Sequence, residues 1–236
     1  MRAPLQLLDP ESSTCTYLLA DERSGTAILI DPVEEQVARY LDVLTALGLR
    51  LLWTVETHVH ADHVTGALRL ARLTGARTAS PAACGTSGAT RELAHGDVLF
   101  FGRRFIEALH TPGHTAGGMC FLLRSQPGAA GHVFTGDSLL IGGCGRTDFQ
   151  GGGAGVLYDS ITRVLFTLPD DTVVWPGHDY SGKGKSSIGQ ERRQNPRLAG
   201  RSREEFITLM GALRLAPPKK IWLAVPANLQ MGQRPH

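Results

Sequence analysis

Three histidines and one aspartate lie within six residues of this chain, as His58, His60, Asp62 and His63. Imidazole is the commonest metal ligand in proteins, and a carboxylate beside it suits a hard or borderline cation. At the chain's own frequencies of these residues, the pattern is expected by chance on the order of 10⁻³ times. A solvated polar loop rich in histidine is the simpler alternative. The segment predicts a metal site if the rest of the chain supplies further ligands.

Three later segments each place one more ligand-type residue directly after a short β-rich run. They are His114 in a Pro-Gly-His turn, Asp137 after Thr-Gly, and His178 in a second Pro-Gly-His turn. Taken singly, either histidine is more often a hydrogen-bonded turn residue, and Asp137 is more often a helix N-cap. Strand ends are where loops gather and sites form. Together with the first cluster, these residues therefore favour one metal centre.

The elements that must position these ligands can be outlined from periodicity and turn residues. The first cluster lies between a buried strand at 51–57 and a helix at 64–73 that Gly75 ends. Strands are also expected at 15–20, 26–30, 98–101, 104–110, 118–123, 132–135 and 172–175, and helices at 32–47, 156–168 and 203–213. Strands and helices alternate in both halves. Helices covering two sheets would form a four-layer α/β sandwich.

Size and composition limit the classes of protein that fit. The chain has 236 residues, 42% of them hydrophobic and 19% charged, with no linker, so one domain over 1–236 is expected. A net charge of +2 is too small to argue for nucleic acid or a membrane surface, and no apolar run would span a membrane. The four cysteines lack C-x-x-C spacing, and the N-terminal segment lacks an apolar signal region. We expect a reducing, cytoplasmic location.

The ligand set as a whole resembles the metallo-β-lactamase superfamily. The matching residues are His58, His60, Asp62, His63, His114, Asp137 and His178. The resemblance runs from about Tyr17 to Tyr180. It implies an α/β, four-layer αββα sandwich with the metal at one edge. The superfamily contains hydrolases, nucleases and oxidoreductases, so the fold does not choose the reaction.

The flanking segments resemble the persulfide (sulfur) dioxygenases within this superfamily. These segments are Asp137–Gln150, Pro176–Tyr180, Glu191–Leu198 and Ala224–Asn228. The resemblance implies oxidation of glutathione persulfide with O₂ and water to sulfite and glutathione, with one non-haem Fe(II) per chain. It also implies that the residues after about 180 form a C-terminal extension that completes the substrate site.

The family's iron ligands correspond by motif position to His58, His114 and Asp137, which are therefore the expected catalytic residues. Two histidines and one carboxylate leave three positions of an octahedral Fe(II) open for the persulfide sulfur and O₂. The remaining members of the set would orient these ligands by hydrogen bonds and accept protons: His60, Asp62, His63 and His178. Because iron performs the oxidation, Cys144 is not expected to act as a nucleophile.

Glutathione carries two carboxylates, which require guanidinium or hydroxyl partners. Arg146, Tyr180 and Arg197 lie in the family-like segments and are the expected substrate-binding residues. A structural salt bridge is an equal alternative for Arg146. Members of the family often have a cysteine near the C-terminus where this chain has Met231, so no role for such a cysteine is expected.

Two other functions stay open at this point. A thioester hydrolase like glyoxalase II would use the same ligands to hold two metal ions, with Asp137 bridging them. Against it, the C-terminal residues resemble the dioxygenases. A metal-binding sensor or redox partner without catalysis is the other alternative, but no DNA-binding or flavin-binding segment is visible. A homodimer is among the assemblies that the sequence leaves open.

Overall fold

The computed structural model describes residues 3–124, 131–180 and 182–234. Contacts divide the chain into two compact units. The first unit holds the residues up to Leu93, Val98–Phe105 and the residues from Pro217 onward. The second holds Ala94–Asp97 and Ile106–Ala216. The ligand-type residues of the first cluster therefore belong to one unit, and His114, Asp137 and His178 to the other.

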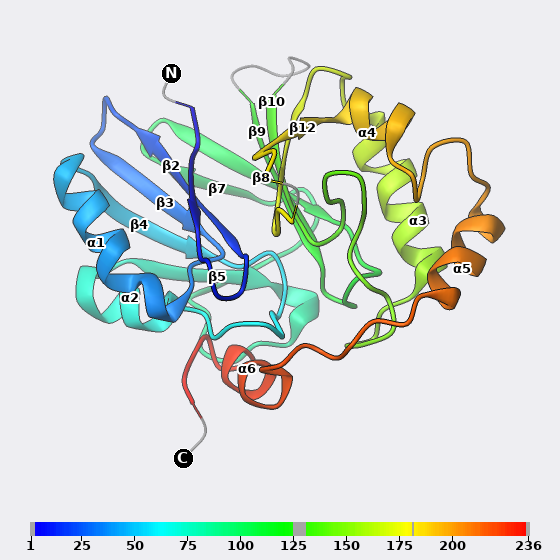
Figure 1. Cartoon of the computed structure of the whole chain (residues 1–236). Coiled ribbons are helices and arrows are strands. Elements are labelled where there is room, and N and C mark those ends of the chain that lie inside the picture. The colour runs from blue at the N-terminus through cyan, green and yellow to red at the C-terminus, as the bar shows by residue number, and fades with distance from the viewer. Residues whose placement is uncertain (1–2, 125–130, 181, 235–236) are drawn as a thin grey trace. The chain divides into compact units, whose positions relative to one another are not determined.

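The first unit is built on a mixed six-stranded sheet in the order β1-β2-β3-β4-β5-β6 (Figure 1). Its strands are β1 (Leu5–Leu8), β2 (Cys15–Asp21), β3 (Thr26–Ile30), β4 (Arg50–Val55), β5 (Arg77–Pro81) and β6 (Arg91–Leu93). The β1–β2 and β2–β3 pairs are antiparallel, and the pairs from β3 to β6 are parallel. Parallel neighbours need a crossover, which the helices supply.

Two of these helices cover one face of the first sheet. They are α1 (Val37–Ala46), preceded by the 3₁₀ turn η1 (Glu34–Gln36), and α2 (Ala67–Thr74). Tyr40, Leu44 and Leu70 from these helices pack on Leu18 and Leu29 of the strands. A further helix, α6 (Ile221–Asn228), contributes Ala224 and Ala227 to a small cluster with Val64 of the histidine loop.

The second sheet is also mixed and six-stranded, in the order β12-β11-β10-β9-β8-β7. Its strands are β7 (Val98–Phe101), β8 (Arg104–His110), β9 (Met119–Arg124), β10 (Gly131–Gly136), β11 (Val173–Pro176) and β12 (Ser186–Ser187). The β10–β11 pair is parallel, while β8–β9, β9–β10 and β11–β12 are antiparallel.

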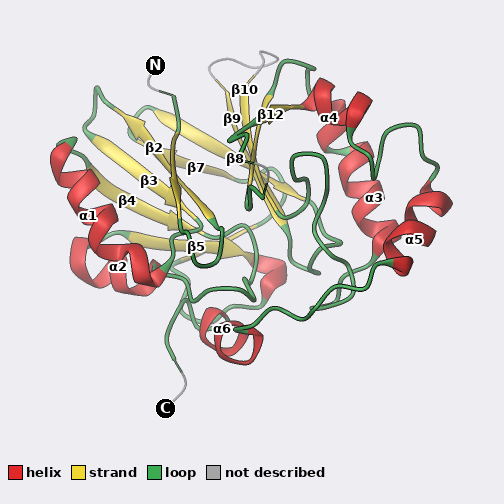
Figure 2. Cartoon of the chain, viewed as in Figure 1, coloured by secondary structure: helices red, strands yellow, loops and turns green. Residues whose placement is uncertain are grey.

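Three helices accompany the second sheet, shown in red in Figure 2. They are α3 (Ala154–Arg163), α4 (Ile188–Gln194) and α5 (Arg203–Ala212), with short 3₁₀ turns at η2 (Ala82–Cys84) in the first unit and η3 (Leu165–Thr167) in the second. Leu157 and Ile161 of α3 pack with Phe206 and Met210 of α5 over Val133 of the sheet. Leu139, two residues after Asp137, belongs to the same core, and Leu157 lies against Gly113 beside His114, so the core holds the loops that carry His114 and Asp137.

Several element boundaries differ from the sequence-based expectation for physical reasons. The helix after the histidine loop begins at Ala67 and not at Val64, because the Thr65 hydroxyl accepts a hydrogen bond from the Ala67 N–H at 3.1 Å. The expected helix at 156–168 ends at Arg163 and continues as the 3₁₀ turn η3. The helix expected from residue 32 begins at Val37, because Asp31 adopts a left-handed φ of 51° and a 3₁₀ turn follows.

Candidate metal centre

His58 follows strand β4, and its ring is oriented by Thr57 and Asp31. The Thr57 N–H donates to Asp31 Oδ1 at 2.7 Å, and the Thr57 hydroxyl donates to Asp31 Oδ2 at 2.8 Å. Because a hydroxyl has a single proton, Thr57 Oγ1 must accept its hydrogen bond from His58 Nδ1–H, at 2.9 Å. The proton on Nδ1 leaves the lone pair on Nε2, which is the atom a metal ion would bind.

His60 is completely buried beside carboxylates of the same unit. Its Nε2 lies 3.1 Å from Asp31 Oδ1 and 3.7 Å from Glu56 Oε2, and its Nδ1 lies 3.9 Å from Asp62 Oδ1. Burial disfavours the charged imidazole, but the attraction of these carboxylates outweighs it and raises the pKa of His60 above its ordinary range. The His60 ring also packs against the His58 ring in a tilted arrangement, with 4.0 Å between centroids and 46° between planes. The arrangement suits a residue that supports His58.

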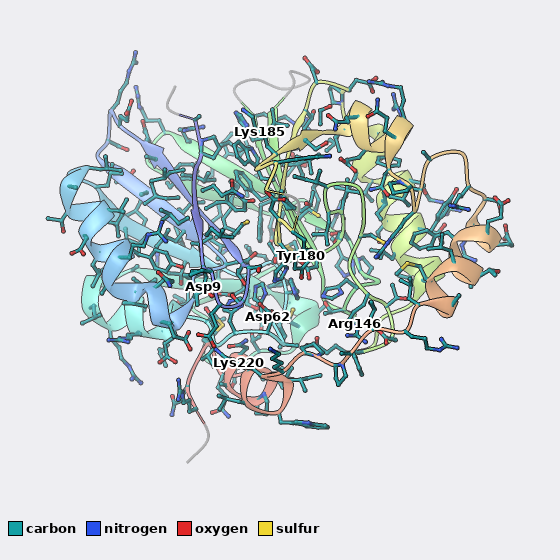
Figure 3. All side chains as sticks on the ribbon, in the orientation of Figure 1. Asp9, Asp62, Arg146, Tyr180, Lys185 and Lys220 are labelled. Carbon is teal, nitrogen blue, oxygen red and sulfur yellow. The ribbon has the colours of Figure 1, made fainter. Side chains whose placement is uncertain are left out.

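Asp62 and His63 are joined to each other and to the turn between β1 and β2. Asp62 Oδ2 lies 3.0 Å from His63 Nδ1 and accepts a hydrogen bond from Thr14 Oγ1 at 2.8 Å. Burial lowers the pKa of His63 and favours its neutral form. One ligand atom from each of His60, Asp62 and His63 lies within 4.8 Å of the others, so this group could hold a cation (Asp62 is labelled in Figure 3).

The second unit brings His114, Asp137 and His178 together. The His114 Nδ1–H donates to the Arg146 carbonyl at 2.7 Å, because a carbonyl can only accept. This leaves a lone pair on His114 Nε2, which lies 3.6 Å from Asp137 Oδ2. The other carboxylate oxygen, Oδ1, lies 2.8 Å from His178 Nδ1. An imidazole nitrogen and a carboxylate oxygen at this distance are two groups that a metal ion can bind together.

Glycines allow the backbone to approach these ligands closely. Gly113 precedes His114 with a φ of 126°, and a Cβ atom there would lie 2.3 Å from Leu157 N on helix α3. Gly145 donates its N–H to the Asp137 carbonyl at 2.7 Å, and a Cβ atom there would lie 2.7 Å from His114 Nδ1. The Pro-Gly-His turn and the glycine-rich loop therefore set where His114 and Asp137 lie.

Comparison with known proteins places this arrangement in a family. The family model for the metallo-beta-lactamase superfamily matches residues 8–178. The human protein named persulfide dioxygenase ETHE1, mitochondrial, is 46% identical over 96% of this chain and 87% of its own length. The chain belongs to the persulfide dioxygenase family of the metallo-beta-lactamase superfamily.

Structural similarity agrees with this membership in the persulfide dioxygenase family. The crystal structure of ETHE1 from Myxococcus xanthus has a TM-score of 0.93 and 50% identity, and covers 98% of this chain and 100% of its own. A probable metallo-hydrolase from Burkholderia pseudomallei is more distant, at 32% identity over 96% of this chain and 92% of that protein. The expected metallo-β-lactamase fold, with two sheets and accompanying helices, is thus confirmed, and both sheets are mixed.

Arg146 is held in place by contacts within its own unit. Its Nε and Nη2 donate to the two carboxylate oxygens of Asp148 at 2.7 and 2.8 Å, and Nη1 donates to the Ala216 carbonyl at 2.6 Å. The hydrogen bonds from Arg146 hold the pKa of Asp148 below its ordinary range. Arg146 therefore anchors its own loop, and its backbone carbonyl accepts the hydrogen bond from His114 Nδ1–H.

The other two predicted substrate residues have different surroundings. Arg197 is half-buried, and its Nη1 donates to the Cys144 carbonyl at 2.7 Å. Tyr180 is 76% exposed and stacks on His178, with 5.6 Å between ring centroids and 7° between planes. Cys144 itself is buried and burial raises the pKa of its thiol, which agrees with the expectation that it is not a nucleophile.

Sequence reasoning missed several residues that hold the ligands. Among them are Asp31, Thr57, Thr14 and Asn228, which bond to the histidine loop directly. Asp31 directly after strand β3 and Thr57 directly before His58 were visible signals, whereas Thr14 and Asn228 lie too far from the loop in sequence to be recognised.

Glu191 was assigned to a family-like segment without a role. Its buried carboxylate accepts from Gly142 N–H at 2.9 Å, Asn195 Nδ2 at 2.8 Å and Ser186 Oγ at 2.5 Å.

Proposed function

We propose that this chain oxidises glutathione persulfide with O₂ and water to sulfite and glutathione. The observation that carries the proposal is the likeness to persulfide dioxygenases over nearly the whole chain, including the segments that follow His178. The donor set supports it, because two imidazoles with Nδ1 hydrogen-bonded and one carboxylate make up a 2-His-1-carboxylate triad. Membership in the persulfide dioxygenase family makes the chain an enzyme. Glutathione persulfide as its substrate is what we propose.

We place one Fe(II) per chain on His58, His114 and Asp137. The atoms offered would be Nε2 of each histidine and a carboxylate oxygen, and the 3.6 Å separation of His114 Nε2 and Asp137 Oδ2 fits a shared cation. Bound iron would supply the O₂ chemistry that amino-acid side chains cannot. The members of the set outside the triad, His60, Asp62, His63 and His178, would hold these groups and take up protons.

The protein's own contribution is orientation and substrate binding. Asp31 and Thr57 fix the His58 tautomer, and the Arg146 carbonyl fixes that of His114. We propose that Arg146, Tyr180 and Arg197 bind the carboxylates and backbone of glutathione. The exposed ring of Tyr180 supports this role, whereas the Arg146 guanidinium is already paired with the Asp148 carboxylate (both Tyr180 and Arg146 are labelled in Figure 3). The residues after 180 would thus complete the substrate site.

The experiment is anaerobic purification with elemental analysis, followed by an oxygen-electrode assay. We expect about one iron per chain, and one sulfite formed per O₂ consumed with glutathione persulfide. S-lactoylglutathione serves as the control substrate and should not be turned over. Two zinc ions per chain, with thioester hydrolysis and no oxygen uptake, would contradict the proposal.

The hydrolase alternative is not favoured, because the human relative named persulfide dioxygenase ETHE1 matches 96% of this chain and 87% of its own length, and the Myxococcus xanthus ETHE1 structure matches 98% of this chain. No helix among the described residues is long and apolar enough to cross a membrane. We propose a cytoplasmic location on the basis of four free cysteines in the described residues. The human relative is named as mitochondrial, so fractionation of the native host is the test. Light scattering would test the homodimer.

A further inference from the structure

The C-terminal end of helix α6 is joined to the histidine loop by one buried side chain, Asn228. Its Oδ1 accepts the Thr65 N–H at 2.9 Å. Its Nδ2 donates to the His60 carbonyl at 2.9 Å and to the His63 carbonyl at 2.8 Å. Asn228 is 4% exposed, so these bonds are shielded from water. The amide uses both of its N–H groups and its oxygen on a single loop.

The backbone beyond Asn228 adds contacts to the same region. The Leu68 N–H donates to the Met231 carbonyl at 3.2 Å. Gly232 lies against Thr65 so closely that a Cβ atom there would be 2.2 Å from the Thr65 carbonyl oxygen. The end of α6 therefore meets the loop and the first turn of α2 at several points, and its position relative to them is fixed.

The chemistry of the contact requires an amide. Buried carbonyls without a donor are costly, and the His60 and His63 carbonyls lie in a loop that offers them no helix or strand ladder. Aspartate could still accept from Thr65 but would place an acceptor against two carbonyls. Serine has one proton for two carbonyls. Among side chains of this size, asparagine satisfies all three backbone groups.

We infer that Asn228 is a positioning residue for the metal centre, acting through the backbone of the His58–His63 loop. By holding the carbonyls of His60 and His63, it sets how the chain bends between them, and hence where Asp62 and His63 point. The His60 ring in turn packs against the His58 ring at a tilt of 46°, and His60 Nε2 lies 3.1 Å from Asp31 Oδ1. The inference rests on the proposed function, because it assumes that His58 binds the metal.

The test compares Asn228→Asp, Asn228→Ser and Asn228→Ala with Gln230→Ala, which removes an exposed amide two residues further along. Each apo protein is titrated with Fe(II) and, separately, with Zn(II), at a temperature at which thermal unfolding shows it to be folded. The iron-loaded proteins are then assayed for kcat per bound iron and for KM. If the alanine variant does not fold, the serine variant, which keeps one donor, carries the comparison.

We expect metal affinity to fall roughly 10–100-fold in the Asn228 variants, as for loss of other groups that orient ligands. We also expect kcat per bound iron to fall while KM stays near that of the unsubstituted protein, and Gln230→Ala to match it throughout. Variants that lose thermal stability but keep metal affinity and kcat per iron would overturn the inference. An unsubstituted protein that prefers two Zn(II) and consumes no O₂ would contradict the proposed function, while the affinity ranking would still decide the role of Asn228.

Discussion

His58 and His114 each form a hydrogen bond at Nδ1 that fixes the tautomer of the imidazole ring. The Thr57 hydroxyl oxygen accepts the hydrogen bond from His58 Nδ1–H, and the Arg146 carbonyl accepts the one from His114 Nδ1–H. Both imidazoles are thereby held in the tautomer with a lone pair on Nε2. The two acceptors differ in kind: the Thr57 hydroxyl belongs to a side chain and can be removed by substitution, whereas the Arg146 carbonyl belongs to the backbone and cannot.

A set of five variants separates a one-iron site from a two-metal site. His58→Ala, His114→Ala and Asp137→Ala should each purify nearly free of iron and inactive, because each loses a direct ligand. His63→Ala and His178→Ala should keep most of their iron, with activity or affinity reduced by roughly 10–100-fold. Iron content and oxygen uptake are measured on all five. Equal metal loss in all five would show that the one-iron assignment is wrong.

Arg197→Ala should raise KM for glutathione persulfide by the equivalent of about 1.5–3 kcal/mol, because a charge-assisted hydrogen bond to a carboxylate is lost. Arg197→Lys keeps the charge and should lie between. Since Arg197 also donates to the Cys144 carbonyl, iron content is measured alongside the kinetics. Arg193→Ala, which removes an exposed arginine that pairs with Asp170, is the matched control. An unchanged KM for Arg197→Ala would remove this residue from the substrate site.

At the scale of elements, the turn between β8 and β9 depends on helix α3. Gly113 has a positive φ of 126° that disfavours other residues, and a Cβ atom there would meet the backbone of Leu157. Gly113→Ala should therefore move His114 away from Asp137, or push α3 outward. We expect a loss of at least 2 kcal/mol in stability, roughly the upper range for strained backbone and overpacking. Thermal unfolding and iron content measure the two effects. Gly182→Ala is the control for backbone strain alone, because Gly182 also has a positive φ but a Cβ atom there would meet nothing within 4 Å.

The sequence predicted the strands and the ligand-bearing loops well, because both depend on local pattern. Strands β2, β3, β7 and β8 lie within a residue of their expected limits. The interior strand β5, the short edge strands β1, β6 and β12, and the helices α4 and α6 were missed. Edge strands have few residues in which a period can be seen, and α6 is apolar around most of its circumference, so no amphipathic pattern marks it. The partners of the ligands were missed because they are set by tertiary contacts: Asn228 is 165 residues from His63.

At the scale of the whole molecule, acid stability has an identifiable source in Asp21. This carboxylate lies at the end of β2 and is 5% exposed. It accepts from the Arg103 N–H at 2.9 Å, the Ser24 hydroxyl at 2.9 Å and the Arg103 guanidinium. The backbone hydrogen bond from Arg103 is the main cause that holds the pKa of Asp21 well below its ordinary range. A carboxyl whose pKa is lower in the folded state than in the unfolded state stabilises the protein at pH values above the unfolded-state pKa, which is about 4.

Asp21→Asn should therefore destabilise the protein near neutral pH and lose its effect in acid. The loss expected at pH 7 is about 1.5–3 kcal/mol, the range for hydrogen bonds to a charged group. As pH falls below about 4, the unfolded-state carboxyl becomes protonated while the folded one stays ionised, so the difference between the two proteins should shrink. Denaturant unfolding of both proteins at several pH values measures it. A difference that is constant from pH 7 to pH 3 would exclude Asp21 as the source.

The contact of Asn228 with the histidine loop also bears on when the metal can be bound during synthesis. The loop leaves the ribosome early, whereas Asn228 follows 165 residues after His63. At roughly 5–20 residues per second, the loop waits on the order of 10–30 s for its last partner. During that interval its histidines are part of a nascent chain that lacks the amide holding their backbone. Stable metal loading should therefore follow release of the C-terminus, and a stalled chain lacking α6 would expose imidazoles to whichever cation the cell holds in excess.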